Sequence, residues 1–179
     1  MKQIFILFSL LLIISCKNAS NYSSENTSFK KYSNVIEALK DANDFNEDNG
    51  TLKLLSEDTV IPKIQISKQI FEGDEESLII EQTKRDLIYV IFQSFAVTDI
   101  KEIEVTSVPI KEDKTYDNKF KETIKVKREI AKSILKKYLN TESFEDLYKL
   151  EGTIYLPNEK FDLLKNQELK NIYNDLTNM

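Results

Sequence analysis

Apolar residues recur at three- and four-residue steps in four parts of the chain, a period that is typical of helices burying one face. The predicted helices cover residues 28–44, 78–97 and 130–139, and one or two terminal helices cover residues 161–176. The second is apolar almost all round, and its centre, residues 87–92, would also suit a buried strand. Its length and its polar flank, EQTKRD, favour a helix.

Two segments replace this helical period by strict alternation, which is typical of strands with one buried face. We expect residues 102–106 and 123–127 to form an antiparallel hairpin with 111–118 as its loop. The apolar pairs are Ile103 with Val126 and Val105 with Ile124, and the polar pairs are Glu104 with Lys125, Glu102 with Lys127 and Thr106 with Thr123. A one-residue slip would break every pair, because side chains alternate between the faces of a strand.

Two shorter segments are also predicted to be extended. Residues 60–66 suggest a strand that Pro62 interrupts, which places it near a sheet edge, and residues 153–156 suggest another. Helices and strands together predict an α+β fold. We expect a small antiparallel sheet, with its hairpin at about 100–110 and 119–127, and helices packed on one face.

The segment before the last predicted strand carries the signals of a helix. Ser143 with Asp146 resembles a helix cap. We therefore expect a short helix that continues through Leu150 and closes at Gly152.

The N-terminus has the layout of an export signal. Lys2 precedes an apolar run over residues 4–14, and Ser15 and Cys16 follow it. The run has about eleven residues, whereas a helix that spans a bilayer needs about twenty. The run therefore predicts a signal peptide and not a retained membrane helix.

Ile13-Ile14-Ser15-Cys16 resembles the lipobox of bacterial lipoproteins. The resemblance implies transfer of a diacylglycerol to the Cys16 sulfur, cleavage before Cys16 and acylation, for example by palmitate, of the new N-terminus. Cys16 is the only cysteine of the chain, and lipidation would use a thiol that an exported protein otherwise leaves free. The alternative is an ordinary secretory signal in which Cys16 is incidental.

The chain divides into three parts on this interpretation. Residues 1–15 are the signal peptide, and residues 16–31 are the lipidated cysteine and a flexible tether, rich in Ser and Asn and nearly free of aliphatic residues. Residues 32–179 have the length of a single α+β domain. We expect the protein in a bacterial cell envelope, anchored by lipid. The residue after Cys16 is Lys17 rather than an aspartate, which favours the outer membrane over the inner one in a Gram-negative cell.

Composition excludes several kinds of chemistry. The 179 residues include no histidine, one cysteine and three widely spaced glycines, so we expect no cofactor, no thiolate or histidine catalysis and no phosphate-binding loop. The acidic stretch from Asp44 to Glu57 resembles a calcium loop, but its glycine and closing acid stand at the wrong positions. We therefore predict no metal site and no catalytic residue.

Charge is unevenly distributed along a chain whose net charge is −5, which makes nucleic acid an unlikely partner. Residues 37–86 carry thirteen acids and six bases, whereas residues 111–137 carry ten bases and five acids. The candidate contacts for an anionic surface are Lys119, Lys121, Lys125 and Lys127. The simpler interpretation is that these lysines are the solvated face of a strand.

These observations predict an envelope-anchored lipoprotein with a non-catalytic binding domain. Its partners would be the membrane, through the lipid on Cys16, and an unknown envelope protein or anionic ligand. The alternatives are a carboxylate-dependent hydrolase of the envelope and a toxin-neutralising or inhibitor lipoprotein. A deep pocket with converging acids of raised pKa would favour the hydrolase, and a shallow surface with an exposed apolar patch would favour binding or inhibition.

Overall fold

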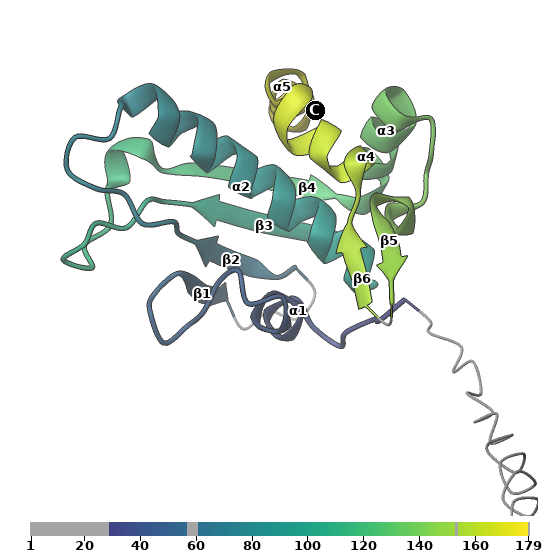
Figure 1. Cartoon of the computed structure of the whole chain (residues 1–179), viewed down its shortest axis with the longest axis horizontal. Coiled ribbons are helices and arrows are strands. Elements are labelled where there is room, and N and C mark those ends of the chain that lie inside the picture. Colours follow the sequence, from purple (N-terminus) through teal and green to yellow (C-terminus); the bar gives the residue numbers. More distant parts are fainter. Residues whose placement is uncertain (1–28, 57–60, 153, 179) are drawn as a thin grey trace, which may run out of the picture.

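A four-stranded mixed sheet carries the helices on one of its faces (Figure 1). The computed structural model describes residues 29–56, 61–152 and 154–178. The strands, in their order across the sheet, are β1 (Leu52–Ser56), β2 (Lys63–Ile66), β3 (Glu102–Ser107) and β4 (Glu122–Lys127). The predicted α+β class, with helices on one face, is therefore confirmed.

The prediction of a purely antiparallel sheet is wrong, because β2 and β3 pair in parallel. A parallel pair needs a long connection from the end of one strand back to the start of the next. Helix α2 (Glu76–Val97) is that connection, and its 22 residues extend for about 33 Å along the sheet. The pairs β1–β2 and β3–β4 are antiparallel.

The C-terminal half of helix α2, from about Leu87 to Val97, is buried on nearly all sides, which explains why this part of its sequence is largely apolar. One side packs on the inner face of the sheet, and the other contacts α1 (Val35–Asp41), the π-helical segment η3 (Leu163–Gln167) and α5 (Leu169–Thr177). The strand alternative for residues 87–92 is excluded, since these residues are helical. Leu87, Ile91 and Phe95 are among the fully buried side chains of the core.

The β3–β4 register is the one that the alternation predicts. Every predicted pair is present, including Ile103 opposite Val126 and Glu104 opposite Lys125. The hydroxyl oxygens of Thr106 and Thr123 lie 2.9 Å apart across the two strands. The apolar members of the pairs are 4% exposed or less and form part of the core.

The second strand of this hairpin begins later than predicted, at Glu122 and not at 119. Residues Asn118–Phe120 form a short 3-10 helix, η1. Asp117 starts it, because its side-chain oxygen accepts a hydrogen bond from the Lys119 backbone N–H at 3.1 Å. The turn buries Phe120 and displaces Lys119 from the strand.

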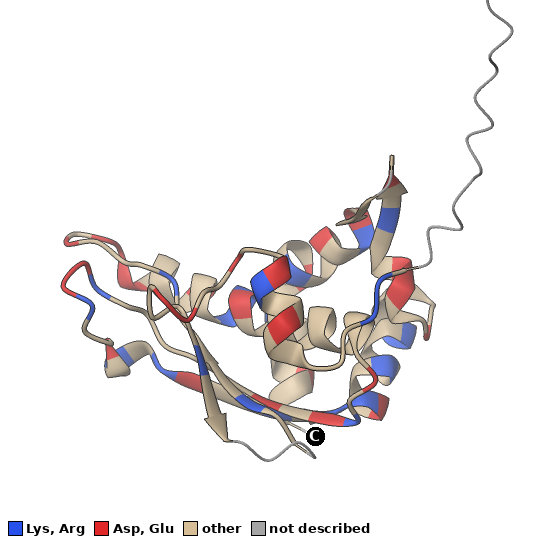
Figure 2. Ribbon diagram, turned by 90° about the horizontal axis from the view of Figure 1, so that it is seen from below, with Lys and Arg blue, Asp and Glu red and all other residues tan. Residues whose placement is uncertain are grey.

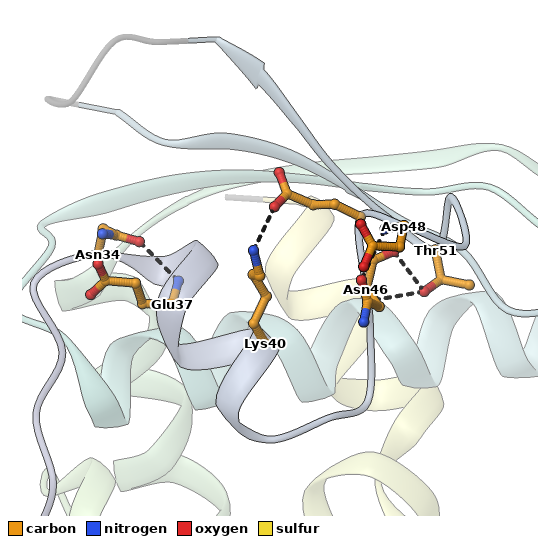
Figure 3. A network of polar contacts seen from close by, with 7 residues as sticks. Asn34, Glu37, Lys40, Asn46, Asp48 and Thr51 are labelled. Carbon is orange, nitrogen blue, oxygen red and sulfur yellow. Dashed lines mark hydrogen bonds and ion pairs between the residues drawn. The ribbon is translucent and has the colours of Figure 1, made fainter.

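Helix α1 is also shorter than predicted, because Asn34 caps it. The Asn34 side-chain oxygen accepts the Glu37 N–H at 2.9 Å (Figure 3). The described residues before it are not helical, and the Tyr32 N–H donates to the Val97 carbonyl at 2.8 Å. Phe29, placed in the predicted tether, packs its ring against Tyr148 at 5.1 Å, so the folded domain begins at least three residues earlier than predicted.

Strand β1 has no counterpart in the predicted elements. A turn leads into it, where the Asn46 side-chain oxygen accepts the Asp48 N–H and Lys40 pairs with Glu47, both at 2.9 Å (Figure 3). Strand β1 occupies the edge of the sheet, so β2 lies near the edge, as predicted, but is not the edge strand itself. Pro62 does not interrupt β2, since it lies before the first residue of the strand.

The C-terminal part adds helices and a small hairpin. Its elements are α3 (Arg128–Leu139), the 3-10 helix η2 (Phe144–Leu147), β5 (Tyr148–Glu151), β6 (Ile154–Pro157), α4 (Glu159–Asp162), η3 and α5. The predicted helix through Leu150 is wrong beyond residue 147. Residues 148–151 instead pair with β6 in an antiparallel hairpin, so their backbone groups bond to the neighbouring strand.

Candidate functional site

A pocket of about 520 Å³ lies at the N-terminal end of α2, and we call it the distal pocket. The segment between β2 and α2 and the loop between β3 and β4 enclose it. Its apolar lining residues are Ile70, Phe71, Ile79 and Phe120, and its charged lining residues are Glu72, Asp74, Glu76, Lys111, Glu112, Asp113, Asp117 and Lys119. The chain enters the domain at the other end of α2, beside Val97 (Figure 1).

Backbone pairing beyond the ends of β2 and β3 holds the two loops together. The Ile70 N–H donates to the Ile110 carbonyl at 2.9 Å, and the Ile110 N–H donates to the Lys68 carbonyl at 3.0 Å. Gly73 has a φ of 94°, a conformation that favours glycine, and Asp74 accepts the Phe71 N–H at 2.8 Å. This turn leaves the Phe71 side chain outside the core, with 54% of its surface exposed.

The rim of the distal pocket is strongly acidic, with six carboxylates against two lysines. Both lysines are engaged: Lys119 pairs with Glu76, and Lys111 pairs with Asp117 at 3.5 Å. The Thr115 hydroxyl donates to Asp113 and lowers the pKa of that carboxyl, so it stays ionised at neutral pH. Red segments in the loops at this end of the molecule show the same excess (Figure 2).

A second pocket, of about 200 Å³, lies beside the middle of α2, and we call it the Asp86 pocket. Its charged lining residues are Asp44, Lys68, Arg85, Asp86 and Lys165, and the others are Phe45, Tyr89 and Pro157. They come from the segment after α1, the segment after β2, α2, β6 and η3. The sequence feature that could have pointed to this pocket is a charged residue on the apolar face of a helix. Asp86 lies seven residues, or two helical turns, after the buried Ile79 and therefore on the same face of α2.

The Asp86 carboxylate is unusual because it is 8% exposed and makes no hydrogen bond or ion pair with any residue that the structure describes. Burial raises the pKa of Asp86 to about 6. Asp44 adds to this shift, whereas Lys68, Arg85 and Lys165 oppose it. The Tyr89 hydroxyl donates to Asp44 at 2.5 Å, and burial together with this bond raises the pKa of Tyr89.

The lysines that the sequence singled out for an anionic surface are divided between two places. Lys125 and Lys127 lie on the exposed outer face of β4, whereas Lys119 lines the distal pocket and Lys121 follows η1. Lys125 also pairs with Glu102 at 3.4 Å. Glu102 and Glu104 of the neighbouring strand β3 lie opposite these two lysines, and both colours are present on the strands (Figure 2), so the structure does not gather the four lysines into one basic patch.

Cys16 lies outside the described residues, so the structure places neither the lipobox nor the predicted lipidation site. Among residues 29–56, 61–152 and 154–178, no helix combines the length and apolar character that a membrane crossing requires. In the same segments no three acidic, histidine or cysteine side chains converge as ligands for a metal ion. Comparison with known proteins returns no relative: no family model, curated protein or solved structure matches the chain.

Proposed function

We propose that this protein is a lipoprotein, anchored in a bacterial envelope through Cys16, whose domain binds a partner and catalyses nothing. The observation that carries the binding function is the distal pocket, where an exposed Phe71 borders an apolar floor inside an acidic rim. An exposed aromatic side chain beside a hollow is typical of protein interaction sites.

The chemistry of the distal pocket favours a cationic partner segment that carries an apolar side chain. The apolar side chain would fill the floor formed by Ile70, Ile79 and Phe120, and lysines or arginines beside it would meet the carboxylates. The length of α2 separates this pocket by about 30 Å from the point where the chain enters the domain. The pocket therefore suits a partner approaching from the side away from the anchor.

The hydrolase alternative has one observation in its favour, the raised pKa of Asp86 in a pocket that also contains Asp44. Three features argue against it. Asp44 already accepts a hydrogen bond from the Tyr89 hydroxyl, three cations line the same pocket, and a volume of about 200 Å³ is small for a polymeric substrate. We therefore propose binding. The inhibitor alternative would use the same distal surface and differs only in what the partner does.

The binding proposal is tested with a defined peptide on the full lipidated protein in neutral detergent. We expect a lysine–leucine peptide to bind and a matched glutamate–leucine peptide not to bind. Phe71→Ser, and Glu112→Gln with Asp113→Asn, should each weaken binding about tenfold. The matched controls are Leu78→Ser, an exposed apolar residue outside the pocket, and Glu81→Gln with Glu159→Gln, which should leave it unchanged.

Equal binding of both peptides, or equal effects of the pocket and control variants, would refute the binding proposal. A photo-crosslinker placed at position 71 in living cells would capture the partner and distinguish the inhibitor alternative from simple binding. If the captured protein is an enzyme or toxin whose activity falls in the complex, inhibition replaces simple binding as the function.

The anchoring proposal has its own experiment. Cys16→Ser should leave the exported protein without lipid and release it from the membrane fraction, because the sulfur is the attachment atom. A variant that still sediments with membranes after salt and carbonate washing would refute anchoring through Cys16.

A further inference from the structure

The Asp86 pocket concentrates charge without pairing it. Five charged side chains line it, Asp44, Lys68, Arg85, Asp86 and Lys165. None of them forms an ion pair within 4.0 Å with any residue of the described segments, although twelve other ion pairs are present there. Asp86 is the buried member of this set, and a buried charge without a partner is costly for the fold and indicates a site that is completed by a ligand.

The negative side of the pocket consists of two unequal carboxylates. Asp44 is exposed, and one of its carboxylate oxygens accepts a hydrogen bond from the Tyr89 hydroxyl. Asp86 is more than nine-tenths buried and accepts no hydrogen bond from the described residues. A group that donates several hydrogen bonds and carries a positive charge would satisfy Asp86, and a primary ammonium has both properties.

The positive side consists of two lysines and an arginine. The Lys68 ammonium lies 4.6 Å from the centre of the Phe45 ring, and the Lys165 ammonium lies 5.3 Å from the centre of the Tyr89 ring. Both ammonium groups therefore stand over aromatic faces, and neither forms an ion pair with a carboxylate of the described residues. Lys68 also donates to the Asp44 backbone carbonyl at 3.5 Å. Arg85 precedes Asp86 on α2 and is half-buried. A carboxylate would neutralise these cations, and a guanidinium can bind it with two parallel hydrogen bonds.

A ligand with a single charge fits this pocket poorly. An anion alone would meet the buried Asp86 carboxylate, and a cation alone would meet three unpaired cations. We propose that the Asp86 pocket binds a small zwitterion of the amino-acid type, with its ammonium at Asp86 and its carboxylate toward Arg85 and Lys165. The volume of about 200 Å³ suits a molecule of this size. This site is separate from the distal pocket and does not depend on the partner proposed there.

The test uses calorimetry on the full lipidated protein in neutral detergent, with glycine, L-alanine, L-valine and L-leucine as probes. Ethylamine and propionate are the matched controls, because each is alanine without one of its charged groups. We expect at least one amino acid to bind with a Kd of about 1 mM or below. The two single-charge controls should bind at least tenfold more weakly than alanine.

Two variants test the two sides of the pocket separately. Asp86→Asn and Arg85→Gln should each weaken amino-acid binding about tenfold or more, whereas Glu112→Gln in the distal pocket should not change it. If Asp86→Asn fails to fold, Arg85→Gln decides, since its side chain is half-buried only.

The proposal is overturned if no amino acid binds at about 10 mM, a concentration that fills a millimolar site. It is also overturned if ethylamine or propionate binds as well as alanine, since one charge would then account for recognition. Neither result bears on the peptide experiment at the distal pocket, so the two proposals fail independently.

Discussion

The outer face of the sheet and the Asp86 pocket both carry carboxylates next to lysines, but they arrange them in opposite ways. On the sheet, Glu104 pairs with Lys63 at 3.3 Å and Glu102 pairs with Lys125 at 3.4 Å. In the Asp86 pocket no charge is paired within the described part of the chain. Paired, solvated charges specify how strands align at little cost, whereas unpaired buried charges oppose folding. We infer that the paired charges of the sheet help to fix the strand alignment, whereas the unpaired charges of the pocket are available to bind a ligand.

The largest loss of stability is expected when a charge is introduced into the packed core. Val105 lies on the inner face of β3 and is fully buried. Val105→Asp should reduce the free energy of unfolding by about 3 to 5 kcal/mol, because it leaves an uncompensated charge in the core. Urea unfolding of the full chain measures this change. Val105→Ala, which removes packing without adding charge, is the control and should cost less than Val105→Asp.

The second effect concerns the natural buried charge, Asp86. Its pKa is about 6 in the folded protein and 3.8 in the unfolded chain, so the folded state holds the proton more tightly. Stability should therefore fall as pH rises from about 4 to about 6. Asp86→Asn removes the charge. We therefore expect its free energy of unfolding to be about 3 kcal/mol higher than that of the wild type at pH 8 and equal to it near pH 3.5.

Unfolding curves at the two pH values measure this difference. Glu81→Gln, the loss of an exposed carboxylate on the same helix, is the control and should change stability little at either pH. A constant difference between Asp86→Asn and the wild type across the pH range would show that the Asp86 carboxyl is not the titrating group.

A much smaller effect is expected for a paired charge on the outer face of the sheet. Glu104→Gln should reduce stability by about 0 to 1 kcal/mol, because exposed ion pairs contribute little. The same unfolding experiment measures it. If Glu104→Gln costs as much as Val105→Asp, the assignment of inner and outer faces is wrong.

The smallest effect is expected for the lysines of the anionic-surface hypothesis. Only Lys125 and Lys127 belong to β4, and Glu102 and Glu104 lie opposite them, so little net positive charge remains there. In co-sedimentation at low salt, the exported Cys16→Ser protein should bind phosphatidylserine vesicles less than about twofold better than phosphatidylcholine vesicles. A large preference that disappears at about 0.3 M salt and on replacing Lys119, Lys121, Lys125 and Lys127 by Gln would reinstate the hypothesis.

The β3–β4 hairpin was predictable residue by residue because its information is local and redundant. Each of the two strands has an apolar and a polar series, and only one register matches both. Helix α2 was predictable from its length and apolar content. The turn at η1 was not, because one Asp117 side chain interrupts an alternation of lysines that otherwise continues into the strand.

The parallel pairing of β2 with β3 was not predictable from the local pattern. Both strands are short, and the residues that pair are about forty positions apart in the chain. The edge strand β1 has three exposed residues among its five, so its alternation is weak. Both pockets were missed for a related reason. Asp44, Asp86 and Lys165 line the same pocket only because α2 packs between the N-terminal and C-terminal segments of the chain.

The crossover through α2 also sets an order in time. The β3–β4 pair can close once the loop at residues 108–121 is made, whereas β2 can join β3 only after the longer connection at residues 67–101, with the whole of α2, is in place. Strand β1 pairs only with β2, so its docking on the sheet depends on that slower event. In a chain that emerges N-terminus first, β1 and β2 are therefore made before β3, and the side of β2 that pairs with β3 stays open to wrong pairings until β3 has been made and α2 is in place.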